Sequence, residues 1–149
     1  MKSNKSFTLI ELLVVIAVMA GFMALLVPNY MEVRMKSRDT RRKGDLRNIQ
    51  KALELYKQSQ PLPSYPEDVV ACEKIEDLNT VYMPKVPQDP KSQCGASVSS
   101  YYYVRNESDE TRYTMFACLE NKNDPEGVVG SCPEAFECGS TNCYQLTEP

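Results

Sequence analysis

Residues 5–27 read KSFTLIELLVVIAVMAGFMALLV, and the rest of the chain is organised around this stretch. From Phe7 to Val27 the only charged residue is Glu11. As an α-helix with a rise of about 1.5 Å per residue, this segment would span roughly 31 Å, the thickness of a bilayer core. The sequence therefore predicts a membrane-spanning helix.

Glu11 separates three interpretations of this segment. A secretory signal peptide would be cut after Ala20, but its apolar region is usually only about 7–15 residues long. A plain single-pass anchor has no use for a carboxylate, which is costly and usually paired inside a membrane. The positions one turn ahead of Glu11 are Val14 and Val15, so no basic side chain of the same helix face can pair with it. We expect its partner to come from another chain or from a newly exposed amine.

The stretch Lys5-Ser6-Phe7-Thr8-Leu9-Ile10-Glu11, followed by the apolar run, resembles the class III signal of type IV pilins and the related pseudopilins. The resemblance implies cleavage by a prepilin peptidase between Ser6 and Phe7, followed by N-methylation of Phe7. It also implies that Glu11 neutralises the Phe7 amine of a neighbouring subunit during assembly. The family usually has Gly before the cleavage site, whereas this chain has Ser6, which is also small.

A helix is predicted to continue through residues 29–58. The resemblance implies one long curved helix with a kink at Pro28, loosened between Gly21 and Pro28 in a filament. The alternative is that Pro28 ends the first helix and starts a second. Apolar residues at helical spacing are expected to pack on a sheet: Leu46, Ile49, Leu53 and Tyr56. The basic belt of residues 34–45 has no such stripe, so we expect it to be solvated or to contact neighbouring heads or anionic lipid.

The second half is predicted to be a small α+β head of antiparallel strands packed on the helix. The predicted strands are 98–105, 112–119 and 143–146, with a polar hairpin loop at 106–110 and one buried face at Tyr113, Met115, Ala117 and Leu119. A short helical turn is predicted at Glu67–Glu76, and an extended loop at Tyr82–Pro90.

Charge is divided unevenly along the chain. Residues 1–58 carry 11 basic and 5 acidic side chains, whereas residues 59–149 carry 6 and 15. The acidic half should not bind nucleic acid, because such binding relies on basic side chains. The basic residues after the apolar segment would place the head in the cytoplasm by the positive-inside rule. Six cysteines favour the oxidising side instead, and the family resemblance agrees with them.

The cysteines are expected to form disulfides rather than a metal site, since the chain has no His and no CxxC pair. Their positions are Cys72, Cys94, Cys118, Cys132, Cys138 and Cys143. We expect Cys72 to pair with Cys94 and the other four to close the tail. The carboxylates that could bind calcium are interpreted as solvated turn residues: Asp89, Glu107, Asp109 and Asp124. We expect no metal and no cofactor.

The predicted organisation is a leader at 1–6, a hydrophobic helix at 7–28, an amphipathic stem at 29–58 and a disulfide-rich head at 59–149. The chain is not expected to be an enzyme, because it lacks His, a nucleophile motif and a Gly-rich phosphate loop. The favoured function is a structural subunit of a type IV pilus-like filament. The alternatives are a pseudopilin of a secretion or DNA-uptake machine and a monomeric membrane-anchored binding protein.

The partners implied by the resemblance are further copies of the chain, the prepilin peptidase, an inner-membrane assembly platform and the membrane itself. The chain would be a single-pass membrane protein before assembly and part of a cell-surface filament afterwards.

Overall fold

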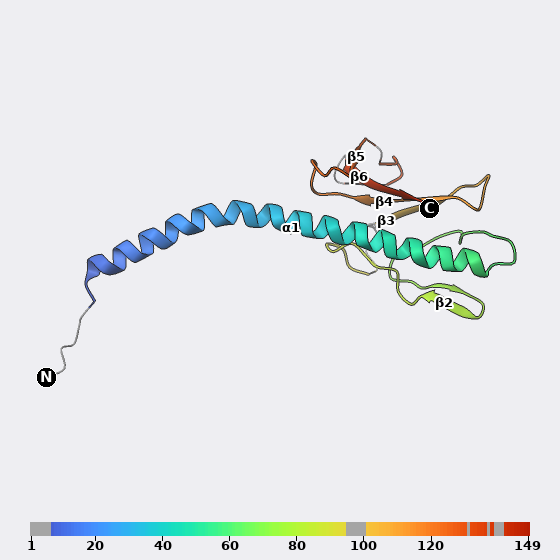
Figure 1. Cartoon of the computed structure of the whole chain (residues 1–149), viewed down its shortest axis with the longest axis horizontal. Helices are drawn as coiled ribbons and strands as arrows, with labels where there is room; N and C mark the ends of the chain where they lie inside the picture. The colour runs from blue at the N-terminus through green and yellow to red at the C-terminus, as the bar shows by residue number, and fades with distance from the viewer. Residues whose placement is uncertain (1–6, 95–100, 131, 137, 139–141) are drawn as a thin grey trace. The chain divides into compact units, whose positions relative to one another are not determined.

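One long helix precedes all of the strands in the chain. The computed structural model describes residues 7–94, 101–130, 132–136, 138 and 142–149, without the side chains of residues 27–29 and 129. Helix α1 runs from Leu9 to Ser59 (Figure 1). It is continuous through Pro28, so the alternative in which Pro28 separates two helices is wrong. The chain divides into two compact units between Met35 and Lys36, and α1 contributes to both.

The strands form two antiparallel sheets. Their bounds are β1 Ile75–Asp77, β2 Thr80–Met83, β3 Tyr101–Arg105, β4 Tyr113–Cys118, β5 Val128–Val129 and β6 Asn142–Thr147. Strands β1 and β2 form a hairpin, and the larger sheet has the order β3-β4-β6-β5. Strands β3, β4 and β6 confirm the three predicted strands, except that residues 98–100 lie outside the described part of the chain. Tyr101 of β3 lies opposite Ala117 of β4, and Ala117 lies opposite Tyr144 of β6.

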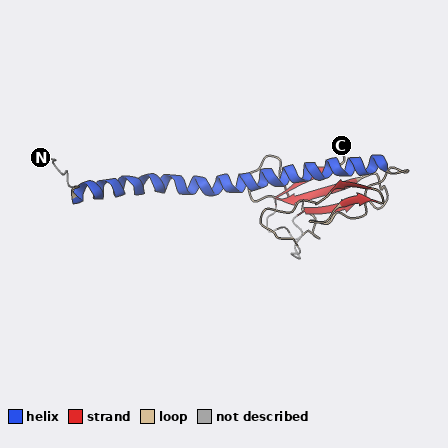
Figure 2. Ribbon diagram, turned by 90° about the horizontal axis from the view of Figure 1, so that it is seen from below, coloured by secondary structure: helices blue, strands red, loops and turns tan. Residues whose placement is uncertain are grey.

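The core of the head lies between the second half of α1 and the four-stranded sheet (Figure 2). The residues that β4 and the residue after it contribute to this core are Tyr113, Met115, Ala117 and Leu119. Phe116 belongs to a second buried cluster with Phe136 and Cys143. The helix contributes Leu46, Ile49, Ala52 and Leu53, with Tyr56 half-buried beside them. Both predicted apolar faces are therefore confirmed, and each fully buried large side chain contributes about 1.5–3 kcal/mol.

The helical turn predicted at Glu67–Glu76 is wrong, because this segment is held in turn and extended conformations. The backbone N–H of Cys72 donates to the carbonyl of Val86 at 2.9 Å, and that of Val86 donates to the carbonyl of Glu73 at 2.7 Å. Cys72 also has a φ of 69°, which a helix does not allow. Strand β1 then begins at Ile75, which is buried in the core.

Strand β5 was not predicted. Just before it, the backbone at Gly127 passes close to the side chain of Asn142. A Cβ added to Gly127 would lie 2.4 Å from both Nδ2 and Oδ1 of Asn142. Asn142 is buried, and its Nδ2 donates to the carbonyl of Asn121 at 3.0 Å. A side chain at position 127 would therefore have to displace the buried side chain of Asn142.

Candidate functional site

Three reciprocal hydrogen bonds between Thr8 and Glu11 form the start of α1. The carboxylate Oε2 of Glu11 accepts from the backbone N–H of Thr8 at 3.0 Å and from its hydroxyl at 2.8 Å. The hydroxyl of Thr8 in turn accepts from the backbone N–H of Glu11 at 3.3 Å. This is a capping box, in which a Thr and a Glu three residues apart satisfy the free N–H groups of a helix start.

The capping box corrects one step of the sequence argument. Glu11 has no basic partner on its own helix, as expected, but it has a neutral hydrogen-bond partner in Thr8. The Thr-x-x-Glu pattern of residues 8–11 carries this signal in the sequence. A carboxylate held in this way has a fixed position at the end of the helix, where a cation from outside the chain can approach it.

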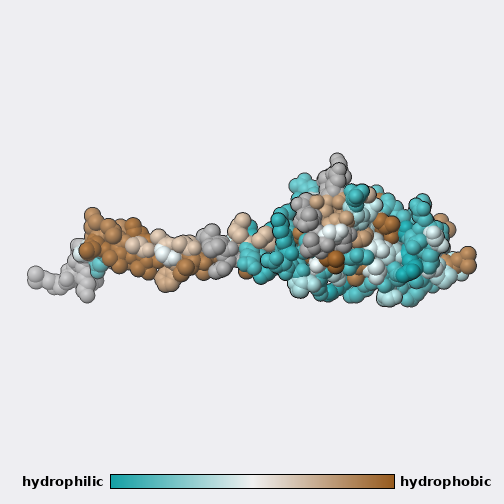
Figure 3. Space-filling view, turned by 90° about the horizontal axis from the view of Figure 1, so that it is seen from above, coloured by the Kyte–Doolittle hydropathy of each residue, from teal (hydrophilic) through white to brown (hydrophobic). Residues whose placement is uncertain are grey.

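The first part of α1 presents an apolar surface all the way round. Residues 7–26 are all exposed, with Phe22 at 65 % and Leu9 at 82 % of full exposure. Figure 3 shows these residues as a mostly brown surface, whereas the coloured residues of the head are largely teal. Among the described residues, α1 is the one helix that is long and apolar enough to cross a membrane.

The other predicted site residues of this segment lie as follows. Ser6 is outside the described residues, so the cleavage between Ser6 and Phe7 stays a prediction. Phe7 is exposed and directly precedes the capping residue Thr8. Gly21 lies inside α1 with open space around it, and the backbone at Pro28 is helical.

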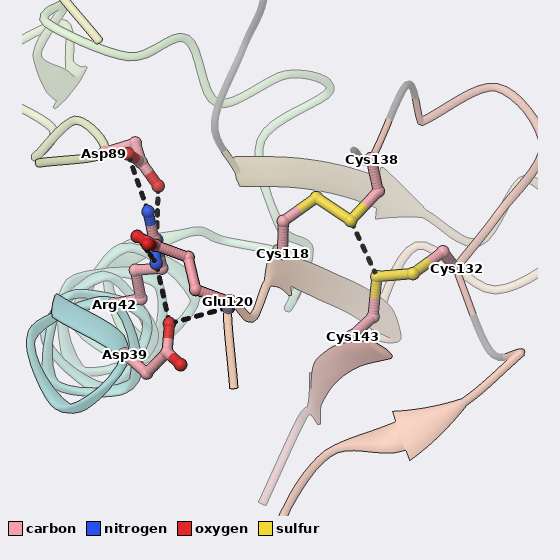
Figure 4. The surroundings of a disulfide bond; sticks show 8 residues. All are labelled: Asp39, Arg42, Asp89, Cys118, Glu120, Cys132, Cys138 and Cys143. Atoms are coloured by element: carbon pink, nitrogen blue, oxygen red, sulfur yellow. Dashed lines mark hydrogen bonds and ion pairs between the residues drawn. A yellow bond between two sulfur atoms is a disulfide. The ribbon is translucent and has the colours of Figure 1, made fainter. Parts of the chain in front are cut away.

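A buried ion network joins α1 to two loops of the head (Figure 4). It consists of Asp39, Arg42, Asp89 and Glu120. The guanidinium of Arg42, only 3 % exposed, donates to both carboxylate oxygens of Asp89 and to Asp39 Oδ1 at 2.6 Å. Its Nη1 also lies 2.9 Å from Glu120 Oε1.

Asp39 and Arg38 form further hydrogen bonds in this network. The carboxylate of Asp39 accepts from the backbone N–H groups of Glu120 at 3.0 Å and Asn121 at 2.8 Å. Arg38 donates to both oxygens of Glu120, at 2.7 and 2.6 Å. Each buried charge is thus both paired and hydrogen-bonded, which a buried ion needs if it is not to destabilise the fold.

A second ionic contact follows one residue further along α1. The ammonium of Lys43 lies 2.6 Å from Asp124 and 2.8 Å from Glu126. The prediction that the whole belt of residues 34–45 is solvated or contacts other molecules is therefore wrong for Arg38, Arg42 and Lys43. These three cations face acidic groups of their own head, because the folded head places its carboxylates along this side of α1.

These contacts keep the groups charged at neutral pH. The hydrogen bond from Arg38 holds the pKa of Glu120 far below its usual range, although burial opposes the shift. Burial lowers the pKa of Arg42, but its bonds with Asp89 outweigh this effect and raise the pKa above the usual range. For Asp124, burial raises the pKa, and the hydrogen bond from Lys43 reverses the shift, so that the pKa is lowered overall.

The six cysteines form three disulfides. Cys72 bonds to Cys94, Cys118 to Cys138 and Cys132 to Cys143. The pairing expected for Cys72 and Cys94 is the one found, and the other four cysteines join β4 and β6 to the tail. Figure 4 shows the two tail disulfides side by side, with the sulfurs of Cys138 and Cys143 3.7 Å apart.

The four carboxylates interpreted as solvated turn residues do not behave alike. Asp89 and Asp124 are drawn into ion pairs with α1, so the interpretation is wrong for these two. Asp109 and Glu107 are exposed in the loop between β3 and β4, where Asp109 accepts hydrogen bonds from Thr111. The four therefore do not form one calcium site.

Comparison with known proteins supports the interpretation of the amino-terminal segment. A family model described as the prokaryotic N-terminal methylation motif matches residues 1–27. The chain is also 43 % identical over 56 residues to the type IV wide pilus major component PilA4 of Thermus thermophilus. That match covers 38 % of this chain and 43 % of the relative, so the chain spans less than half of the relative's length. No solved structure gives a significant match.

The relative is a major component of a type IV wide pilus by its name, and the matched motif is the one implied by the KSFTLIE stretch. The long apolar helix and the disulfide-bonded antiparallel head are the fold that this resemblance implies. The two matches show that residues 1–27 carry the N-terminal methylation motif and that part of the chain is similar to a type IV pilus component.

Proposed function

We propose that this chain is a structural subunit of a pilus-like filament, held in the membrane by residues 7–28 before assembly and polymerising through them. The observation that carries the proposal is the apolar surface of residues 7–26, which includes 14 large hydrophobic side chains, all exposed. Burying them would release on the order of 20–40 kcal/mol, at about 1.5–3 kcal/mol each. Such a surface has to be covered, first by lipid and then by the same helix of other copies.

The methylation motif supplies the processing step of this proposal. A prepilin peptidase would cut between Ser6 and Phe7, leaving the Phe7 amine one residue before the capping box. The charged amine of one copy and the carboxylate of Glu11 on a neighbour would then neutralise each other in the apolar interior of the filament. Mass spectrometry of the protein from its own host should show residues 1–6 absent and about 14 Da added for one methyl group.

The remaining partners follow from the same proposal. The leader, membrane helix, stem and head would be residues 1–6, 7–28, 29–58 and 59–149, and an inner-membrane platform would draw the processed subunit into the filament. A pseudopilin of a secretion or uptake machine would undergo the same processing. Isolating filaments from the cell surface and identifying their main subunit would separate a pilus from a pseudopilus.

Two substitutions at Glu11 test the charge separately from the cap. Glu11→Gln keeps a capping-box residue, because Glu and Gln both serve at this position, but it removes the negative charge. Glu11→Ala removes both the charge and the cap. We expect both variants to lose surface filaments, since stranding one partner of a buried pair costs about 3–5 kcal/mol at every subunit.

The control is Glu32→Ala, which removes a carboxylate from an exposed position of α1 beyond the apolar surface. Filaments should be counted by electron microscopy, together with the amount of the protein in the membrane. Normal filaments with Glu11→Gln and none with Glu11→Ala would assign Glu11 to capping alone. Normal filaments with both variants, at normal protein levels, would remove the assembly role of Glu11.

A further inference from the structure

A cleft on the head carries two basic side chains that the ion network leaves unpaired. The cleft has a volume of about 400 Å³, and we name it the Arg41–Lys85 cleft. Its lining also includes the Cys72–Cys94 disulfide and the proline-containing segment 86–90. A covalent crosslink and two prolines restrict the backbone here, so the cleft keeps its shape without a ligand.

The charge of this cleft is positive. Arg41 and Lys85 are both exposed, and neither forms an ion pair with any residue that the structure describes. Asp89 also lines the cleft, but its carboxylate is already paired with Arg42. Arg42, the residue after Arg41, is therefore paired with carboxylates of its own head, whereas Arg41 and Lys85 remain available to an anion from outside.

The same head presents a matching acidic element, the loop between β3 and β4. Residues 106–110 read NESDE and are all exposed. The side chain of Asn106 accepts from the backbone N–H groups of Ser108 at 2.8 Å and Asp109 at 3.1 Å, which fixes the loop in one conformation. A loop that is already ordered loses little entropy when it docks. Glu107 has no ion-pair partner among the described residues.

The loop cannot reach the cleft of its own molecule. At its base, the carbonyl of Thr111 accepts from Lys57, near the end of α1, at 3.4 Å. Arg41 lies 16 residues earlier on the same helix, which corresponds to a distance of roughly 24 Å along the helix axis. A contact between the loop and the cleft has to join two copies.

We propose that the Arg41–Lys85 cleft of one copy receives the acidic loop Glu107–Glu110 of a second copy. Because the two surfaces are different, the contact is heterologous and leaves a free cleft and a free loop at the two ends of every dimer. Such contacts repeat into rings or open helical assemblies, which is what a filament requires. This inference rests on the proposed function and adds a polar contact between heads to the packing of the apolar helices.

The test is zero-length crosslinking of filaments formed by the full chain. A carbodiimide activates the carboxylate of Glu107, and the amine of Lys85 displaces the activated group, so that an amide forms and the carbodiimide leaves as a urea. We expect a dimer on a denaturing gel, and a peptide joining Lys85 to residues 107–110 in its digest. We do not expect this bond within one molecule, because the base of the loop contacts Lys57, whereas the cleft contains Arg41, roughly 24 Å earlier along α1.

Charge reversals test whether the contact contributes to assembly. Lys85→Glu and Glu107→Lys should each reduce filament yield by about two- to fivefold, the range given by one exposed ion pair. The double variant should restore the yield, because it exchanges the charges across the interface. Lys122→Glu and Glu134→Lys are matched controls, since both residues are exposed and lie outside the cleft and the loop. The controls should form filaments like the unmodified chain.

Filaments that form normally but give no peptide joining Lys85 to 107–110 would overturn this inference and leave the proposed function standing. The same holds if Lys85 is joined to another acidic segment, or if the double variant is no better than the single ones. Loss of binding to vesicles of phosphatidylglycerol in Lys85→Glu, without any crosslink, would assign the cleft to lipid instead. A chain that forms neither filaments nor crosslinked dimers would overturn both proposals.

Discussion

Replacing Arg42 with Met should destabilise the head strongly, because it removes the cation that lies between the buried carboxylates of Asp39 and Asp89. The substitution keeps most of the side-chain volume and deletes the contacts to Asp89, Asp39 and Glu120. Glu120 keeps Arg38 and Lys91 as partners. The loss of stability therefore comes from Asp39 and Asp89, which are left without a cationic partner in Arg42 and are only 1 % and 8 % exposed.

Stranding a buried charge in this way costs about 3–5 kcal/mol. For a unit of this size, each kcal/mol corresponds to a shift of roughly 4 °C in melting temperature. We therefore expect Arg42→Met to melt roughly 12–20 °C lower than the unmodified protein. The assay is thermal unfolding of the full chain in detergent micelles at neutral pH, followed by the near-ultraviolet circular dichroism of the tyrosines in the head.

Lys74→Met is the matched control, because it breaks an ion pair whose two side chains are 56 % and 47 % exposed. Such a pair is worth about 0–1 kcal/mol. The double variant Arg42→Met, Asp89→Asn should recover part of the loss, since it removes one of the stranded charges. If Arg42→Met costs no more than Lys74→Met, the network does not stabilise the head and the reasoning is refuted.

Replacing Glu120 with Gln should make the free energy of unfolding fall less between neutral and acidic pH. Folding lowers the pKa of the Glu120 carboxyl, so this group stabilises the fold above its unfolded pKa of about 4.3. The contribution is lost as the pH falls further. Denaturant unfolding at pH 3 and pH 7 measures the difference, and equal losses in both proteins would contradict it. Reducing the three disulfides should lower the free energy of unfolding by about 2–4 kcal/mol per bond. Melting with and without reductant tests this, and an unchanged Tm would disprove it. Gly127→Ala should cost about 1–3 kcal/mol, because the new methyl group would meet Asn142. Gly44→Ala, in open space on α1, should instead stabilise by about 1 kcal/mol in the same melting assay, and equal effects of both would contradict the clash.

Periodic patterns made most of the fold predictable. The stripe from Leu46 to Leu53 and the alternation from Tyr113 to Leu119 each identify an element and its buried face from local spacing alone. The segment around Cys72 was mispredicted because its conformation depends on distant partners. Its backbone bonds to Val86 and its disulfide to Cys94 act across 14 and 22 residues.

The two parts of the candidate site differ in the same way. The capping box of Thr8 and Glu11 is readable from a four-residue pattern, because its partners are one helical turn apart. The ion network is not readable in this way, since Arg42 is 47 residues from Asp89, and Asp39 is 81 residues from Glu120. A stretch of α1 without an apolar stripe was the only local signal that this face would be buried against charges.

The position of β6 in the sheet has a consequence for how the head is made. It pairs with β4 on one side and β5 on the other, although it follows both in the chain. In the proposed topology the head crosses the membrane in sequence order, so the sheet has no central strand until Asn142–Thr147 have emerged. Cys132 also cannot form its disulfide until Cys143 has emerged. A prematurely terminated subunit would thus keep an open edge on β4, which invites aggregation or proteolysis, and only complete subunits would become compact enough to enter a filament.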